Sequence, residues 1–280
     1  MRFAIIGGDD RYKYLKRLLE TDGHETAAYC CKFTDDCADS IDDAVRGCHA
    51  VLGPIPCTRG KRTLALNECS EIELSVFFEK IPKESLFFAG VVTDEVKAAA
   101  NGIKVYDYFT LPEVAIRNAI PTAEGAIQNA ISESDRTLFG SRVLIIGCGR
   151  CAKALALMLR GMGAKVTLTQ RRPEDEAVIQ GHCLESMHID ELKNRLHEYD
   201  FVFNTAPAPI LDRKMLEYAD KNTLITDIAQ APGGTDFNRA AELGIKAFYC
   251  PGLPGRTAPL TAAEILKEAI IRLTREHFGI

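Results

Sequence analysis

The sequence predicts an α/β protein made of two Rossmann-like domains, each with a doubly wound parallel sheet. Both halves begin alike: a basic residue, four apolar residues and a glycine turn occur at 2–8 and again at 142–149. After both starts, strand-like runs alternate with helical stretches, which is typical of parallel sheets that carry helices on both faces. A chain of 280 residues is also long enough for two domains.

In the first half, a strand is expected at 1–6 and a helix after it. Tyr14, Leu15, Leu18 and Leu19 have the i, i+3, i+4 spacing of an amphipathic helix. Another helix is expected at 94–100. Short apolar runs predict four further strands, at 26–31, 50–53, 86–92 and 103–106.

The second half predicts a sheet of its own. Apolar runs place its strands at 143–146, 165–169, 183–187, 201–204, 223–228 and 245–250. Pro121 suits the first turn of a helix, so a long helix, 121–133, is expected to connect the domains. A capping box, Thr261 with Glu264, is expected to begin the last helix.

These elements predict the domain organisation. Residues 1–118, together with the last helix at about 261–280, are expected to form an N-terminal domain on the substrate side. Residues 119–260 are expected to form the nucleotide-binding domain, including the connecting helix. The active site is expected in the cleft between the domains, at the carboxyl ends of their strands.

The most informative motif is G-x-G-x-x-A, which follows an apolar strand and opens a helix. This is the dinucleotide-binding fingerprint. Gly147 permits a sharp turn, Gly149 permits close approach of a pyrophosphate, and Ala152 keeps the helix near the sheet. The corresponding turn in the first half, Gly7-Gly8, lacks the third small residue, so it is either a plain turn or an anion site.

The end of the next strand indicates which nicotinamide cofactor binds. NAD sites place a carboxylate there, whereas this chain has Gln170, Arg171 and Arg172. Arginine guanidinium groups suit a 2′-phosphate, so NADP(H) is expected, with NAD possible; the alternative is that both arginines are merely solvated. The other residues expected to line the cofactor lie in the glycine motif and at strand ends: Arg150, Cys151, Asn204, Thr205, Ala206 and Asp227.

Composition excludes several other classes of protein. The net charge is −5 without a basic run, which argues against nucleic acid as a partner. No apolar run reaches membrane-spanning length and no signal peptide begins the chain, so a cytoplasmic protein is expected. The ten cysteines are then expected to be free thiols without a metal site. The C-x-x-C spacing of Cys148 and Cys151 is interpreted as part of the glycine motif.

Three longer strings resemble one protein family, the A subunits of bacterial dipicolinate synthase. They lie at 118–125, 227–236 and 251–259, around the glycine motif, and Gly7-Gly8-Asp9 also fits. The resemblance implies oxidation of dihydrodipicolinate, or of its hydroxylated tetrahydro precursor, to dipicolinate with NADP. It also implies sporulation, the mother cell of a spore-forming bacterium, and a partner, the flavoprotein-like B subunit. A homo-oligomer is expected as well.

A site for two substrate carboxylates needs cationic side chains. The candidates are Arg11, Arg59 and Arg256, and Thr122 is expected near the nicotinamide. Two carboxylates are the candidate catalytic groups. Glu124 is expected either to accept a proton or to cap the connecting helix. Asp227 is expected to orient the nicotinamide carboxamide or to bind water.

A wider similarity to two-domain dehydrogenases of the formate and 2-hydroxyacid type leaves two alternatives open. Gln230 and Gly252 stand where those enzymes have a catalytic arginine and a catalytic histidine. Oxidation of a hydroxy acid needs a base for the hydroxyl proton, so this departure argues against that chemistry. The alternatives are a dehydrogenase of another small carboxylate and a non-catalytic, cofactor-binding subunit.

Overall fold

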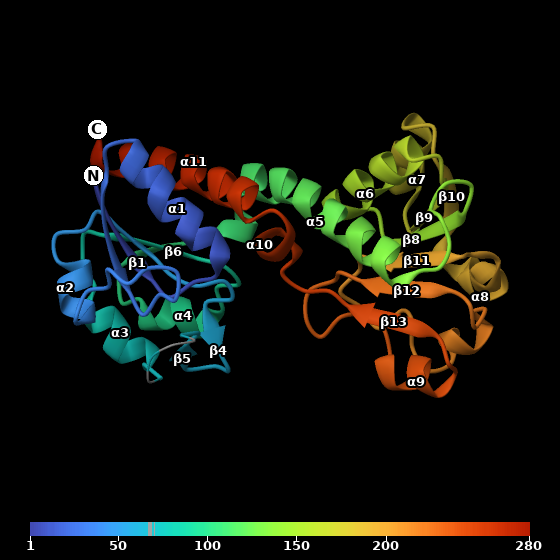
Figure 1. The fold of residues 1–280 in the computed structure, drawn as a ribbon, viewed down its shortest axis with the longest axis horizontal. Helices are drawn as coiled ribbons and strands as arrows, with labels where there is room; N and C mark the ends of the chain where they lie inside the picture. Colours follow the sequence, from blue (N-terminus) through green and yellow to red (C-terminus); the bar gives the residue numbers. More distant parts are fainter. Residues whose placement is uncertain (67–68, 70) are drawn as a thin grey trace. The chain divides into compact units, whose positions relative to one another are not determined.

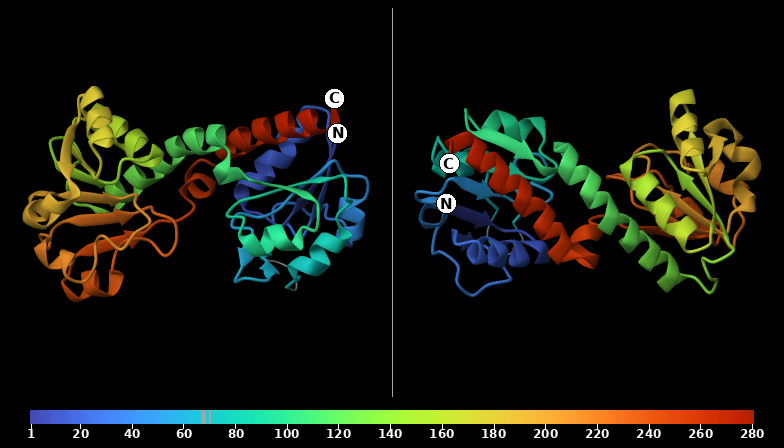
Figure 2. Two further views of the ribbon diagram at one scale, coloured as in Figure 1. Left: turned by 180° about the vertical axis from the view of Figure 1, so that it is seen from behind. Right: turned by 90° about the horizontal axis from the view of Figure 1, so that it is seen from above.

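The computed structural model describes residues 1–66, 69 and 71–280, which form two compact units. The terminal unit contains Met1–Asn118 and Ala258–Ile280, and the central unit contains Ala119–Thr257. Each unit is built around one parallel sheet (Figure 1, Figure 2), of five and six strands respectively, which confirms the predicted α/β fold class.

The sheet of the terminal unit has the strand order β2-β1-β3-β6-β7. Its strands are β1 (Arg2–Ile6), β2 (Glu25–Tyr29), β3 (Ala50–Leu52), β6 (Leu86–Ala89) and β7 (Lys104–Asp107). Helices α1 (Asp10–Thr21) and α11 (Pro259–Phe278) pack on one face. The other face carries α2 (Ile41–Val45), α3 (Leu74–Lys80) and α4 (Asp94–Ala99). A hairpin of β4 (Thr58–Arg59) and β5 (Thr63–Leu64) follows β3, and the 3-10 turn η1 (Tyr108–Thr110) follows β7.

Strand β1 illustrates why this sheet forms. Successive side chains of a strand point to opposite faces. Phe3 and Ile5 pack with the α1 and α11 side of the core, whereas Ala4 and Ile6 pack with the α2–α4 side. All four are fully buried. A strand covered on both faces reads as a continuous apolar run rather than an alternating one.

The sheet of the central unit has the order β10-β9-β8-β11-β12-β13. Its strands are β8 (Arg142–Ile146), β9 (Lys165–Gln170), β10 (Glu185–His188), β11 (Phe201–Asn204), β12 (Leu224–Asp227) and β13 (Lys246–Tyr249). One face carries α5 (Pro112–Glu133), α6 (Arg150–Gly161), α7 (Pro173–Gly181) and α10 (Leu253–Thr257). The other carries α8 (Leu192–Arg195), α9 (Phe237–Glu242) and the 3-10 turns η2 (Ile189–Glu191), η3 (Leu196–Glu198) and η4 (Met215–Tyr218).

Two predicted helix starts are wrong. The connecting helix was expected at 121–133, but α5 begins at Pro112 and contains Pro121 in its interior. Proline suits the first position of a helix, because an N–H group there would have no partner within the helix. Pro112, and not Pro121 as predicted, occupies that position. The last helix begins at Pro259 rather than at the box that starts with Thr261, again with proline in the first turn.

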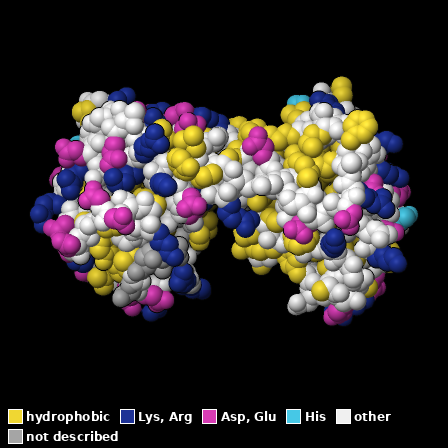
Figure 3. Space-filling model, viewed as in Figure 1, with side chains coloured by type: hydrophobic (Ala, Val, Ile, Leu, Met, Phe, Trp, Pro, Cys, Tyr) yellow, Lys and Arg dark blue, Asp and Glu magenta, His cyan; other side chains and the backbone are white. Residues whose placement is uncertain are grey.

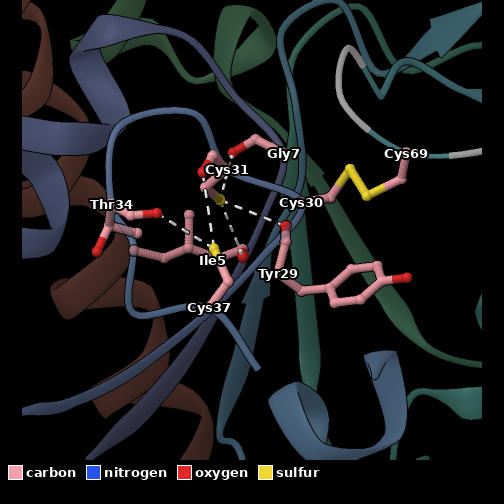
Figure 4. The surroundings of a disulfide bond; sticks show 8 residues. All are labelled: Ile5, Gly7, Tyr29, Cys30, Cys31, Thr34, Cys37 and Cys69. Carbon is pink, nitrogen blue, oxygen red and sulfur yellow. Dashed lines mark hydrogen bonds between the residues drawn. A yellow bond between two sulfur atoms is a disulfide. The ribbon is translucent and has the colours of Figure 1, made fainter. Parts of the chain in front are cut away.

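The cysteines do not all remain free thiols, contrary to the expectation. Cys30 and Cys69 form a disulfide (Figure 4), and the other eight are free. The two bonded residues are 39 positions apart in the sequence, but their Cα atoms lie 5.8 Å apart, within the usual range for a disulfide. Only the fold brings them together, so the spacing in the sequence gives no sign of the bond.

On the face shown in Figure 3, basic and acidic side chains are interspersed. None of the helices in the described part of the chain combines the length and the apolar character needed to cross a membrane.

Candidate functional site

The glycine motif lies at the carboxyl edge of the central sheet, between β8 and α6. Gly147 has φ of +110°, and a Cβ atom there would lie 2.6 Å from Thr205 Oγ1. Its amide donates to Thr169 Oγ1 at 3.0 Å. Thr205 donates from both its amide and its hydroxyl to the Ile146 carbonyl, at 3.0 and 2.9 Å. The ends of β9 and β11 therefore hold the turn from both sides, and only glycine fits it.

The start of α6 is open toward solvent. Gly149 is its N-cap residue, has φ of −77° and provides no side-chain cap. No heavy atom lies within 4 Å of the position that a Cβ atom of Gly149 would take. The first N–H groups of a helix have no partners within the helix. An uncapped start with free space beside it fits a bound pyrophosphate, while fully buried Ala152 lets α6 pack closely on the sheet.

A buried hydrogen-bond network joins the ends of β11 and β12. Asp227 is fully buried, and Oδ2 accepts from Asn204 Nδ2, the Gly234 amide and Thr235 Oγ1 at 3.0, 2.8 and 2.7 Å. Its Oδ1 accepts from the Ala229 amide at 3.0 Å. Four donors satisfy this carboxylate, so it fixes the loop that follows β12.

Asn204 is turned back onto its own loop. Its Oδ1 accepts from the Ala206 amide and its Nδ2 donates to the Ala206 carbonyl, both at 3.2 Å. A Cβ atom on Gly234 would lie 2.3 Å from the Ala208 carbonyl oxygen. The loops after β11 and β12 are thus packed against each other with no room for a side chain at Gly234.

The end of β9 carries the basic residues expected at a 2′-phosphate. Gln170 is buried at the end of the strand, and Arg171 and Arg172 are exposed. Arg172 donates two hydrogen bonds to Asp175 in the first turn of α7, at 3.0 and 3.1 Å. This contact lowers the pKa of the Asp175 carboxyl. Asp175 was missed in the sequence analysis, although its i, i+3 spacing from Arg172 is a usual signal of such a pair.

The two cysteines of the glycine motif lie against different elements. Cys148 Sγ lies 3.9 Å from the Asp175 carbonyl of α7. Cys151 lies against the Thr122 hydroxyl of α5. Burial raises the pKa of both thiols, and the Thr122 contact opposes this at Cys151 only in part. Both thiols are free. The contact also places Thr122 beside the start of α6.

Glu124 is not brought to the glycine motif. It is exposed and lines an apolar hollow of about 530 Å³ with Ile127, Met158 and Met162. Side chains two positions apart in a helix point to nearly opposite sides, so Thr122 and Glu124 diverge. The expectation that Glu124 caps the connecting helix is wrong, because α5 begins three turns earlier, at Pro112.

The terminal unit has a second candidate site at the carboxyl edge of its sheet. The turn after β1, the loop after β3 and the β4–β5 hairpin enclose a pocket of about 180 Å³. This volume is below the 300–1,000 Å³ of usual ligand pockets, so it suits a small molecule. The pocket is lined by Gly8, Asp9, Pro54, Ile55, Pro56, Thr58, Arg59 and Ala65.

Arg11 does not line this pocket but holds Asp9, which does. Its side chain is only 4% exposed, and its guanidinium donates to both Asp9 oxygens, from Nε at 2.8 and 3.0 Å and from Nη2 at 2.7 Å. Asp9 also caps α1 by accepting from the Arg11 amide. Beside them, the Tyr12 hydroxyl donates to the Gly53 carbonyl. The predicted substrate ligand Arg11 is therefore bound to Asp9, a partner that the sequence analysis missed.

The three predicted substrate arginines fall in different units. Arg11 and Arg59 belong to the terminal unit. Arg59 lines the pocket, and Arg11 binds Asp9, which also lines it. Arg256 is exposed on α10 in the central unit. Helix α10 packs on α5 at Gly125, where a Cβ atom would lie 3.0 Å from atoms of Leu253 and of Thr257.

Comparison with known proteins identifies both halves of the chain. Residues 2–109 match the model of the N-terminal domain of the dipicolinate synthase A subunit, and residues 129–233 match that of shikimate/quinate 5-dehydrogenase. Over 295 aligned residues the chain is 33% identical to the A subunit of dipicolinate synthase from Bacillus subtilis (strain 168), covering 99% of this chain and 96% of the relative. The chain belongs to the family of dipicolinate synthase A subunits. The resemblance inferred from the sequence strings is confirmed.

Solved structures agree with this family. The crystal structure of dipicolinate synthase, A chain, from Bacillus subtilis superposes with a TM-score of 0.88 at 31% identity, covering 100% of this chain and 97% of that chain. The apo structure of D-lactate dehydrogenase from Escherichia coli has a TM-score of 0.64 at 16% identity, covering 100% and 98%. The latter likeness shows a shared fold alone.

Proposed function

We propose that this chain is an NADP-dependent oxidoreductase that oxidises dihydrodipicolinate, or its hydroxylated tetrahydro precursor, to dipicolinate. The observation that carries the proposal is an uncapped, open glycine motif in a member of the family of dipicolinate synthase A subunits. The central unit then binds the cofactor and the terminal unit binds the dicarboxylate.

The residues present fit NADP(H). The start of α6 at Gly149 would hold the pyrophosphate, and the exposed Arg171 and Arg172 after β9 would bind a 2′-phosphate. NADP⁺, when bound, supplies a hydride acceptor at its nicotinamide ring. Thr122 and Thr205 lie beside the glycine motif and line the cofactor. Asp227 acts as a positioning residue, because its four donors fix the loop after β12.

Two glycine variants separate binding from folding. Gly149→Ala is expected to leave stability within about 0.5 kcal/mol of the wild type, since the added Cβ meets open space. It should weaken NADPH binding at least about tenfold by occupying the place where the pyrophosphate approaches. Gly147→Ala should instead lower the free energy of unfolding by about 1–3 kcal/mol, because φ is positive there.

Urea unfolding and NADPH fluorescence titration measure the two quantities. Unchanged NADPH affinity in a folded Gly149→Ala variant would contradict a pyrophosphate at this position.

The proposed reaction mainly requires the protein to hold the substrate and the cofactor in the right geometry. Dihydrodipicolinate loses a hydride to NADP⁺ and a proton to solvent or a nearby base, and the ring becomes aromatic. Holding two reactants in the right geometry can itself supply much of the rate enhancement. The substrate also needs cationic partners for its carboxylates. Arg59 in the pocket wall is proposed as one of them, while Arg11 holds Asp9 in place.

The Arg59→Ala variant tests the substrate site. We expect its affinity for pyridine-2,6-dicarboxylate to fall about 10- to 100-fold, the loss of one charge-assisted hydrogen bond, with NADPH affinity unchanged. Isothermal titration calorimetry measures both. Arg46→Ala is the matched control, since Arg46 is an exposed arginine of the same unit paired with Asp43. An equal loss of dicarboxylate affinity in the two variants would show that the affinity depends only on the net charge of the protein, and would contradict a direct contact with Arg59.

A second candidate function is a non-catalytic, cofactor-binding subunit. It is favoured by the state of the two predicted catalytic carboxylates: Asp227 is satisfied by four donors, and Glu124 lines a hollow away from the glycine motif. In that case a flavoprotein-like B subunit would carry the chemistry. For either function we propose the cytoplasm as the location, association with the B subunit, and self-association of the chain.

A further inference from the structure

The disulfide lies next to the pocket of the terminal unit. Cys30 directly follows β2, and Cys69 follows the β4–β5 hairpin. These segments meet at Gly7, where a Cβ atom would lie 2.9 Å from Leu66 Cδ2 and 4.0 Å from the Cys30 carbonyl oxygen. Ala65, the neighbour of Leu66, lines the pocket. The disulfide therefore ties one wall of the pocket to the end of the sheet.

The hairpin has its own hydrogen bonds, which do not depend on the disulfide. The Ala65 amide donates to the Cys57 carbonyl and the Leu64 amide donates to the Ile72 carbonyl, both at 2.9 Å. Breaking the disulfide would leave these bonds in place and release only the end of the hairpin near Leu66. The expected change is thus local to the pocket wall rather than a loss of the fold.

The chain does not have the cysteine usage of a disulfide-stabilised framework. Such frameworks pair their cysteines, whereas eight of the ten here are free. Of the two bonded residues, Cys30 is buried and Cys69 is partly buried, so Cys69 is the more exposed partner. Thiol–disulfide exchange requires access to one of the sulfur atoms. A single bond with one partly exposed partner, among eight free thiols, favours a reversible redox pair over a structural framework.

The neighbouring thiols do not compete for this pairing. Cys31 Sγ points away from the disulfide (Figure 4) and donates to the carbonyl oxygens of Gly7 and Tyr29 at 3.1 and 3.3 Å. Burial raises the pKa of Cys31 and of Cys57 to about 12. Both therefore stay protonated near neutral pH, and a protonated thiol is a poor nucleophile.

We propose that Cys30 and Cys69 form a reversible redox site that sets the affinity of the terminal-unit pocket for its dicarboxylate. The identity of that ligand rests on the proposed function. In the reducing direction, a thiolate of an external dithiol attacks Cys69 Sγ, and the Cys30 sulfur leaves and takes a proton. The second thiol of the dithiol then releases Cys69 as a thiol, so the protein pair is reduced and the dithiol ends as a disulfide.

The first measurement counts thiols in the full chain. After air oxidation, alkylation with iodoacetamide in denaturant should add eight groups, and after treatment with dithiothreitol it should add ten. Intact-protein mass spectrometry reads the number. Ten added groups without reductant, under oxidising conditions, would overturn the proposal at once.

The second measurement compares the oxidised and reduced forms. Reduction should speed hydrogen exchange of the Leu66 amide at least about tenfold, while the Leu64 and Ala65 amides keep their hydrogen bonds. It should also weaken binding of pyridine-2,6-dicarboxylate about tenfold, since the ligand must then order the released end of the hairpin. Cys69→Ser should show the exchange rates and the affinity of the reduced form, and dithiothreitol should change neither. Cys37→Ser, which removes a free thiol of the same unit, should keep the response.

The two readouts distinguish the failure of this proposal from that of the proposed function. Identical hydrogen-exchange rates in the oxidised and reduced wild type overturn the redox site, whether or not the pocket binds a dicarboxylate. Redox-dependent exchange without any dicarboxylate binding supports a redox-controlled wall and contradicts the proposed substrate, and with it the stated effect on affinity.

Discussion

Replacing Asp227 by alanine is expected to lower the free energy of unfolding by about 3–5 kcal/mol, as for a broken buried polar network. The substitution leaves buried donors of Asn204, Gly234 and Thr235 on one side and of Ala229 on the other without an acceptor. Asp227→Asn should be milder, because one oxygen remains. Urea denaturation measures both variants.

The matched control for this prediction is Asp135→Ala, which removes an exposed carboxyl of the same unit. It should stay within about 0.5 kcal/mol of the wild type. A stable Asp227→Ala variant that has lost only catalytic turnover would contradict the positioning role and would make Asp227 a direct participant in the reaction.

The double variant Arg171→Ala/Arg172→Ala should bind NADPH about 100-fold more weakly, since charged hydrogen bonds contribute about 1.5–3 kcal/mol each. NADH affinity should change by less than about threefold, because NADH lacks the 2′-phosphate. Among the single variants, Arg171→Ala should have the larger effect, because Arg172 is held by Asp175. Fluorescence titration of both cofactors gives the affinities.

Arg213→Ala serves as the control, since Arg213 is an exposed arginine of the central unit paired with Glu242. Equal weakening of NADPH and NADH by the double variant, or tighter binding of NADH by the wild type, would contradict the preference for NADP.

The sequence predicts the parallel sheets and the glycine motif well because their signals are local. The run before Gly147 is apolar since β8 is buried on both faces, and glycine is needed where φ is +110°. The β4–β5 hairpin could not be predicted in this way, because strands of two residues are too short to show a periodic pattern of apolar residues. The start of α5 was misplaced because two prolines, Pro112 and Pro121, both suit a first turn.

The candidate site was predicted less completely, because its contacts join residues far apart in the sequence. The disulfide of Cys30 with Cys69 and the hollow beside Glu124 follow from packing, which spacing does not reveal. The bond of Arg11 to Asp9 is local, but a basic residue near a glycine turn reads equally as a ligand or as a partner of a cap. A site residue is thus easier to predict by type than by its bound partner.

The proposal that this chain itself carries out the oxidation is tested most directly by turnover of the isolated full chain. Purified protein is mixed with dihydrodipicolinate and NADP⁺, without any partner protein, and NADPH and dipicolinate are quantified. The account predicts that both products form in equal amounts at a rate proportional to the concentration of the chain. Product formation only after a flavoprotein-like partner is added would contradict it and would identify the chain as a non-catalytic, cofactor-binding subunit.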